Sequence, residues 1–261
     1  MLNTGSVCPN CGQPPPNPPG VSAAAARPAA ASLPLEKYLK TGWDLFKRFP
    51  GGFIGFSLFY FLMQAACNSV PLLGWVAGLA LPALLMGNFI VSAKLLQGVK
   101  PHFGDFFLGF RFFLPLLLAF WSAAALIVIG MLLIVPGVYF LVSYVFAAPL
   151  VVDRRLTYRA ALRLSRRTVK QFWSNVFIFC LLLLLVNLFS LVVFFNLLRL
   201  AIFAPIVNLF GPYAYGLGLL ASLPVSCCAV TAAYADLFGW QSDYSEGFPD
   251  NLPAEPEISA P

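Results

Sequence analysis

Charged residues are scarce in this sequence. Asp, Glu, Lys and Arg make up 10% of its 261 residues, whereas 60% of the residues are hydrophobic. A soluble globular domain carries about 25% charged residues. Because so few charges cannot cover a surface that faces water, the composition excludes an ordinary soluble domain. It predicts a protein whose solvent is mainly lipid.

Residues that carry chemistry are also sparse. The chain has one histidine, His102, and a single CxxC pair formed by Cys8 and Cys11. It has no Ser/His/Asp set and no Gly-rich phosphate loop. The centres of its apolar runs hold no ionisable residue, whereas proton relays and ion pathways usually depend on such residues. We therefore predict that the protein is not an enzyme and not a proton-coupled transporter.

Six apolar segments predict membrane spans. A span needs roughly 20 residues to cross about 30 Å of hydrocarbon. Five segments are long enough, and the fourth is short and begins just after Pro136-Gly137. We expect no cleavable signal peptide, because Arg27-Pro28 interrupts the Ala-rich stretch near the N-terminus. The predicted spans cover about 52–70, 72–93, 112–135, 138–152, 172–198 and 214–235.

The basic residues are distributed unevenly between the two sides of these spans. Of the 16 Lys and Arg, 15 fall on one side and only Arg199 falls on the other. The positive-inside rule assigns the basic side to the cytosol, so we predict six spans with both termini cytosolic. The net charge of +6 does not predict nucleic-acid binding, because the cations do not form one solvated face. The 15 are Arg27, Lys37, Lys40, Lys47, Arg48, Lys94, Lys100, Arg111, Arg154, Arg155, Arg159, Arg163, Arg166, Arg167 and Lys170.

Three amphipathic segments, at about 33–49, 103–113 and 157–171, precede the predicted span pairs. They predict interfacial helices. The expected fold is thus an all-α integral membrane protein with six transmembrane helices in three hairpins, each preceded by an amphipathic helix. We predict three regions in the chain. A cytosolic head occupies 1–31, the membrane domain occupies 32–240, and a disordered acidic tail occupies 241–261.

The segment 157–171 is the most basic of the three. We expect it to lie on the cytosolic leaflet and bind anionic lipid, with Leu162, Val169 and Phe172 toward the acyl chains. Two other interpretations stay open: the arginines only set topology, or the helix packs on its own bundle and its cations are merely solvated. The predicted lipid-binding residues are Arg159, Arg163, Arg166, Arg167 and Lys170.

The pair Cys8 and Cys11 resembles one knuckle of a zinc ribbon. A structural zinc site needs four ligands, usually from two knuckles. The pair is therefore a half-site that a second chain could complete, or a remnant without metal. Zinc is the one cofactor that the sequence suggests.

Three further segments carry a family resemblance: 134–139 (IVPGVY), 146–153 (FAAPLVVD) and 160–170 (AALRLSRRTVK). They resemble a broad bacterial family of uncharacterised multi-pass proteins related to the membrane domain of glycerophosphoryl diester phosphodiesterases. Segment 217–239 is similar to that family's last span. The resemblance implies a helical domain in the bacterial inner membrane and no particular activity. Some relatives carry a zinc-ribbon-like head. A small residue usually follows the position of Asp153 in the family, whereas Arg154 follows it here.

Three functions compete on these observations. The first is a non-enzymatic scaffold, assembly factor or regulator, acting through lipids and through a second copy or an unknown protein partner. The second is a transporter or channel for a lipid-like or uncharged solute, which a continuous polar cavity joining Asn88 and Asn187 would favour. The third is an enzyme, which a metal cluster of His102, Asp105 and Asp153 would favour. We expect the first.

The predicted topology can be tested with a single cysteine. In a cysteine-free background, Asn208→Cys should react with a membrane-impermeant maleimide only from outside the cell, because segment 196–213 joins the last two spans on the far side. Labelling of intact cells and of inverted vesicles measures this. Reaction from the cytosolic side alone would contradict the six-span model.

Overall fold

The computed structural model describes residues 33–68, 71–198 and 217–242, and all of its helices belong to one compact unit, Ser32–Pro261. The described residues form helices and no strand. The predicted head lies outside these residues, as does the predicted tail beyond Ser242. The elements are α1 (Leu35–Arg48), α2 (Pro50–Asn68), α3 (Pro71–Leu96), the 3-10 helix η1 (Phe103–Phe112), α4 (Phe113–Met131), α5 (Val135–Ser143), α6 (Ala147–Arg154), α7 (Tyr158–Gln171), α8 (Trp173–Leu198) and α10 (Leu219–Phe238).

Five segments within the described residues are long and apolar enough to cross a membrane. Together with the scarcity of charge, they identify a membrane protein. Helix α2 coincides with the first predicted span but is not among the five. The five segments are Gly78–Leu96, Phe103–Met131, Val135–Arg154, Trp173–Leu197 and Leu219–Phe238.

Large apolar side chains on α4 and α8 are exposed. Val128 and Ile129 on α4 are 68% and 64% exposed, and Phe189 on α8 is 71% exposed. Exposed apolar surface of this extent is rare on proteins that face water. These helix faces are therefore suited to contact with lipid.

The fourth predicted span is broken in the structure. Helix α5 ends at Ser143 and α6 begins at Ala147, where a single helix over 138–152 was expected. Pro149 explains the position of the break. It has no N–H to donate to the carbonyl of Val145, so it disrupts a continuous helix but is tolerated in the first turn of a new one.

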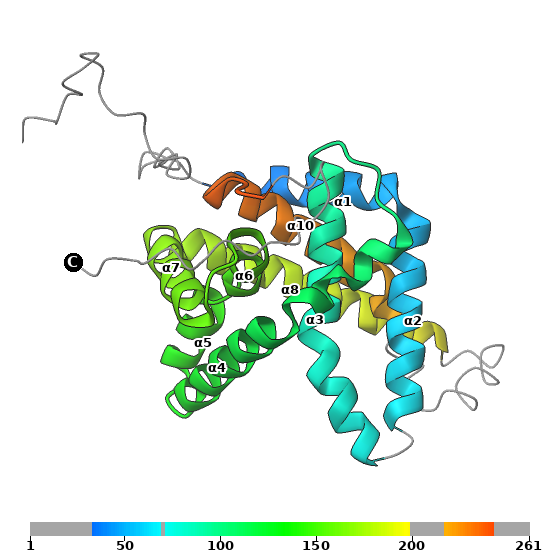
Figure 1. The fold of residues 1–261 in the computed structure, drawn as a ribbon, viewed down its shortest axis with the longest axis horizontal. Helices are drawn as coiled ribbons and strands as arrows, with labels where there is room; N and C mark the ends of the chain where they lie inside the picture. Colours follow the sequence, from blue (N-terminus) through cyan, green and yellow to red (C-terminus); the bar gives the residue numbers. More distant parts are fainter. Residues whose placement is uncertain (1–32, 69–70, 199–216, 243–261) are drawn as a thin grey trace, which may run out of the picture. The chain divides into compact units, whose positions relative to one another are not determined.

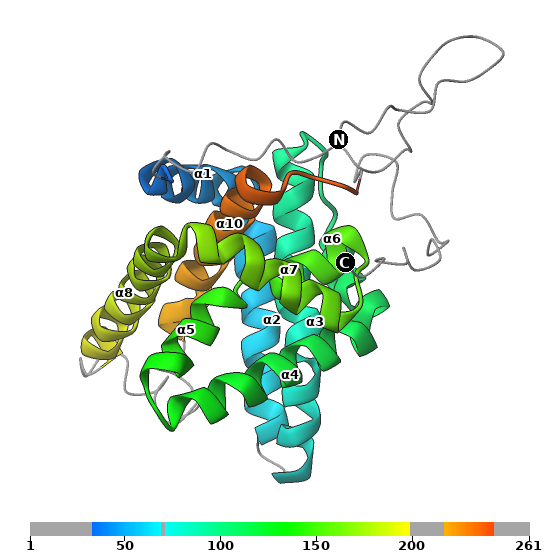
Figure 2. The same ribbon diagram turned by 90° about the vertical axis from the view of Figure 1, so that its left-hand side faces the viewer.

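The helices form two groups, and α8 contacts both, through α5 and α7 in one group and α10 in the other (Figure 1). Helices α4 to α7 pack on one another, and α1, α2, α3 and η1 pack together with α10. Helix α1 lies against α10 (Figure 2). Its Gly42 is required there, because a Cβ atom on this residue would lie 2.8 Å from the backbone nitrogen of Ala229.

The three predicted amphipathic segments are helical, and each buries apolar side chains in the protein. Helix α1 buries Tyr38 and Leu45 in the protein. Element η1 buries Phe106, whose ring stacks on Phe56 with centroids 4.5 Å apart. Helix α7 also buries its apolar face. The prediction of amphipathic helices is confirmed for α1 and α7, whereas η1 is a 3-10 helix that belongs to the apolar segment Phe103–Met131. The expected lipid contact is wrong for the buried residues named.

Element η1 lies against α3 at backbone distance. A Cβ atom on Gly87 would lie 1.9 Å from the carbonyl oxygen of Phe106, and one on Gly109 would lie 2.1 Å from that of Ala83. Each contact leaves no room for a side chain. Two glycines, one on each element, thus set the distance between α3 and η1.

We expect Gly87→Ala to lower the free energy of unfolding by about 1–3 kcal/mol or more, because the added methyl group forces α3 and η1 apart. Unfolding of the purified protein in micelles, followed by tryptophan fluorescence, measures the change. The matched control is Gly78→Ala in the same helix, where a Cβ atom meets nothing within 4 Å. Equal stability of the two variants would contradict the close contact.

Candidate functional site

The five predicted lipid-binding cations all lie on α7. They are exposed, and we call them the basic face: Arg159, Arg163, Arg166, Arg167 and Lys170. The helical period places them on one side because they recur at intervals of three and four residues. Helix α7 contains no acidic residue.

The opposite side of α7 is fixed to the protein. Ala161 and Val169 are buried, and the buried hydroxyl of Ser165 donates a 2.7 Å hydrogen bond to the carbonyl oxygen of Ser143 in α5. Leu162 and Phe172 are also buried in the protein. The structure thus corrects the expectation that these apolar residues, with Val169, insert among acyl chains. It agrees with the alternative in which the helix packs on its own bundle.

Aromatic rings of α5 help to hold the basic face. The guanidinium carbon of Arg166 lies 5.6 Å from the ring centroids of both Tyr139 and Phe140. Hydrogen bonding to Tyr139 raises the pKa of Arg166 above its ordinary value. Arg166 therefore stays charged, and its position is set by α5 as well as by α7.

The charges of α7 differ from those of α1 in their compensation. On α1, Lys40 contacts Glu36 at 2.6 Å and Lys47 contacts Asp44 at 2.9 Å. Hydrogen bonding with Lys40 lowers the pKa of Glu36. None of the five cations of the basic face forms an ion pair with a residue that the structure describes. Of the two amphipathic helices, α7 is therefore the one whose positive charges are not neutralised by nearby acidic side chains.

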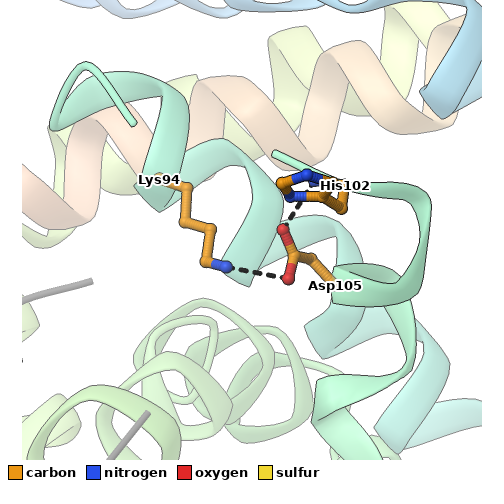
Figure 3. A network of polar contacts seen from close by, with 3 residues as sticks. All are labelled: Lys94, His102 and Asp105. Carbon is orange, nitrogen blue, oxygen red and sulfur yellow. Dashed lines mark hydrogen bonds and ion pairs between the residues drawn. The ribbon is translucent and has the colours of Figure 1, made fainter. Parts of the chain in front are cut away.

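A second polar feature is a mostly buried ion pair between α3 and η1 (Figure 3). The Lys94 ammonium donates to Asp105 Oδ1 at 2.8 Å, and the two side chains are 11% and 13% exposed. The backbone N–H of His102 donates to the other carboxylate oxygen of Asp105, also at 2.8 Å. The Asp105 carboxylate therefore holds the end of α3 and the start of η1 together. The arrangement is structural, because both carboxylate oxygens are occupied.

The third polar feature is Asp153, which is 1% exposed. Its carboxylate accepts hydrogen bonds from the Tyr234 hydroxyl at 2.8 Å and from the backbone N–H groups of Gln241 and Ser242 at 3.3 and 3.1 Å. The Ser242 hydroxyl donates back to the Asp153 carbonyl oxygen at 2.5 Å. Asp153 thus fixes the segment that follows α10 against the end of α6.

Sequence reasoning missed this role of Asp153. Asp153 does not cap the next helix, because the N-cap position of α7 is Thr157. A signal was present, since Asp153 is the only acidic residue between Asp105 and Asp236. A lone acid in so long an apolar stretch must find hydrogen-bond donors elsewhere in the chain.

The residues of a possible metal cluster are not brought together. His102 and Asp105 are neighbours, but Asp153 bonds to Tyr234 and the segment after α10. Within the described part of the chain, no group of three His, Cys, Asp or Glu side chains is placed to hold a metal ion. Cys8 and Cys11 lie outside the described residues, so the zinc half-site stays a prediction.

Polar residues within the spans mostly bond to their own helices. Ser122 and Thr231 donate to carbonyls four residues earlier. Asn187 donates both to the Leu183 carbonyl oxygen and to the Ser226 hydroxyl on α10, each at 2.7 Å. Contacts between helices are made by Asn187 and by two serines. The Ser92 hydroxyl lies 3.2 Å from the Cys228 Sγ atom on α10, and the Ser190 hydroxyl donates to the Gly218 carbonyl oxygen at the start of α10.

Comparison with known proteins adds no relative. No family model, no curated protein and no solved structure matches the chain. The resemblance to the phosphodiesterase-related membrane family stays a prediction from the three segments that carry it.

The ion pair of α3 and η1 yields a stability prediction. Lys94→Met should lower the free energy of unfolding by about 3 kcal/mol or more, because it leaves the Asp105 carboxylate buried without its cation. Adding Asp105→Asn should recover most of the loss, since the amide oxygen can still accept from the His102 N–H. Unfolding in micelles measures both variants.

The control for this prediction is Lys47→Met, which breaks an ion pair whose side chains are 54% and 59% exposed. An exposed pair contributes about 0–1 kcal/mol. If Lys94→Met changed stability no more than Lys47→Met does, the buried pair would not be the contact that joins α3 to η1.

Proposed function

We propose that this protein is a non-enzymatic membrane scaffold, assembly factor or regulator whose cytosolic surface binds anionic lipid headgroups. The basic face of α7 carries the proposal. Its five cations are exposed and lack a described acidic partner, while the other side of the helix is occupied by protein. Such a surface attracts phosphate groups at the membrane.

The proposed topology is six spans in the bacterial inner membrane, with both termini in the cytosol. Five segments with the length and apolarity of spans support it, and the 19-residue helix α2 coincides with the remaining predicted span. The distribution of 15 of 16 basic residues on one side supports the orientation. This topology places the basic face at the cytosolic leaflet, where anionic lipids are available.

The attraction of α7 to lipid would be electrostatic. Because Leu162 and Val169 are buried in the protein, the helix has no apolar face left to insert. Each cation near an anionic surface contributes about 1 kcal/mol. Salt screens this attraction, which decays over a Debye length of about 8–10 Å at moderate salt. Binding should therefore weaken as salt is raised. Binding by insertion of an apolar face would not weaken in this way.

A groove beside the α1–α2 junction offers a second cationic position. Arg48 and Lys100 line it, and its volume is about 430 Å³. Pockets that bind small molecules measure roughly 300–1,000 Å³, so a headgroup would fit. The Arg48 side chain donates to the Leu95 carbonyl oxygen at 3.4 Å, which links the groove to the end of α3.

The buried charges support a structural rather than a catalytic role. Lys94 and Asp105 neutralise each other, and the carboxylate of Asp153 is occupied by three donors. Acid–base chemistry needs a group that is free to exchange a proton with a substrate. The transport alternative gains no support from the two asparagines, because Asn187 bonds to Ser226 whereas Asn88 lines a separate small cavity.

The proposal is tested on the whole protein in nanodiscs that contain phosphatidylcholine and phosphatidylglycerol. Spin-labelled lipid of each type reports its association constant with the protein surface. The wild type should prefer phosphatidylglycerol. Replacing Arg163, Arg166 and Arg167 with Gln should lower that preference at least about fivefold, as expected for the loss of roughly 1 kcal/mol or more. Raising the salt to 1 M should have a similar effect.

The matched control replaces Lys37, Lys40 and Lys47 on α1 with Gln. It removes the same formal charge, but two of these lysines are already paired with Glu36 and Asp44. We expect this variant to keep most of the preference. Equal loss in both variants would show a general charge effect, and no loss in the α7 variant would overturn the proposed role of the basic face.

A further inference from the structure

A small cavity lies where α2, α3 and α10 meet. Its inner wall is formed by buried residues of α2 and α3, among them Phe56 and Leu84. Its outer wall is formed by Tyr60, Leu85 and Leu223, which are half-buried. The cavity measures about 10 Å³, and roughly 10–15 Å³ is enough for one water molecule.

Two polar side chains line this cavity without a hydrogen-bond partner. Ser57 on α2 is 6% exposed and Asn88 on α3 is 2% exposed. Neither the Ser57 Oγ atom nor the Asn88 Oδ1 atom has a partner in the structure. Such atoms are rare in native proteins because an unpaired buried polar group is costly, and hydrocarbon offers it no substitute partner.

Other serines in the spans donate a hydrogen bond to their own helix, and Ser57 does not. Ser92, Ser122 and Ser143 each donate to the carbonyl four residues earlier in their own helix. Ser57 makes no such bond, although its helix continues through Phe53. Its hydroxyl is thus left available to the cavity rather than to its own backbone.

We propose that this cavity binds one hydroxyl group between Ser57 and Asn88. A hydroxyl both donates and accepts, so one O–H group donates to the Asn88 Oδ1 atom and accepts from the Ser57 hydroxyl. A carbonyl group only accepts, so it cannot satisfy the Asn88 Oδ1 atom. An ammonium group could donate to both oxygen atoms, but its charge would be buried in this small cavity without a counter-ion. The volume admits one oxygen atom and excludes a larger polar group.

The hydroxyl can come from either of two sources. One is a trapped water molecule, and the other is a membrane-borne alcohol whose chain leaves between the half-buried leucines. The cavity also lies beside two prolines that interrupt helices, since Leu81 and Leu223, which line it, precede Pro82 and Pro224. Proline removes a backbone hydrogen bond and weakens the helix there, so the walls on α3 and α10 can adjust to the occupant.

The first test is the stability of the full-length protein in micelles. With a hydroxyl bound, Ser57→Ala should lower the apparent Tm by about 2–4 °C through the loss of one hydrogen bond. Asn88→Leu should lower it similarly, and the double variant should lose less than the sum because both bonds share one group. With an empty cavity, each substitution removes an unpaired polar atom and should leave the Tm unchanged or raise it.

The control is Ser122→Ala, whose hydroxyl bonds to the Leu118 carbonyl oxygen of its own helix. We expect its Tm to stay close to that of the wild type. If Ser57→Ala has a Tm at or above that of the wild type before lipid is removed, the proposal is overturned.

The second test separates the two sources, with exhaustively delipidated protein and two probes of equal chain length, 1-dodecanol and dodecane. If the occupant is water, delipidation leaves the difference between wild type and Ser57→Ala intact, and neither probe changes it. If the occupant is an alcohol, delipidation lowers the wild type to the Tm of Ser57→Ala. In that case 1-dodecanol but not dodecane restores it, and Asn88→Leu does not respond.

Discussion

The constraint on which the rest of the structure depends is the absence of water around most of the chain. In hydrocarbon, each polar group must find its partner within the protein. Lys94 finds Asp105, and Asp153 finds Tyr234 and the segment after α10. These contacts join residues from different helices, so they position η1 against α3 and the chain end against α6. Glycines then allow close packing of the helices, as at Gly87, where the backbone of α3 lies against that of η1.

The two strongly amphipathic helices show what this constraint permits at the surface. Helices α1 and α7 both bury an apolar face in the protein, so a face that could have bound lipid instead stabilises the bundle. Their charged faces then differ. Helix α1 carries acids that pair with its lysines, whereas α7 presents arginines alone. Packing of the buried faces does not require this difference in charge, because either kind of charged face could lie on the outside of the same bundle. The difference therefore affects how each helix interacts with other molecules.

Local patterns predicted the helices well because span length, apolarity and helical period are properties of neighbouring residues. They failed where a partner is distant in the chain. The sequence around Asp153 does not indicate that Tyr234 will reach it, and the period of α7 does not reveal whether Leu162 meets acyl chains or other helices. The break before α6 has a local signal in Pro149, which cannot donate a backbone hydrogen bond within a continuous helix. The basic face was predicted residue by residue, but its contact with lipid is still a proposal.

The turn between α4 and α5 has a consequence for how the chain returns across the membrane. Its three residues, Leu132, Leu133 and Ile134, are aliphatic, and together with Val135 at the start of α5 they are 70–84% exposed. The side chains of this turn are all apolar, so exposing them to water is unfavourable and the turn is most stable among the acyl chains. The return path across the membrane is then shorter than the full hydrocarbon thickness. Two helices of 9 and 8 residues, α5 and α6, suffice for it even with the break between them.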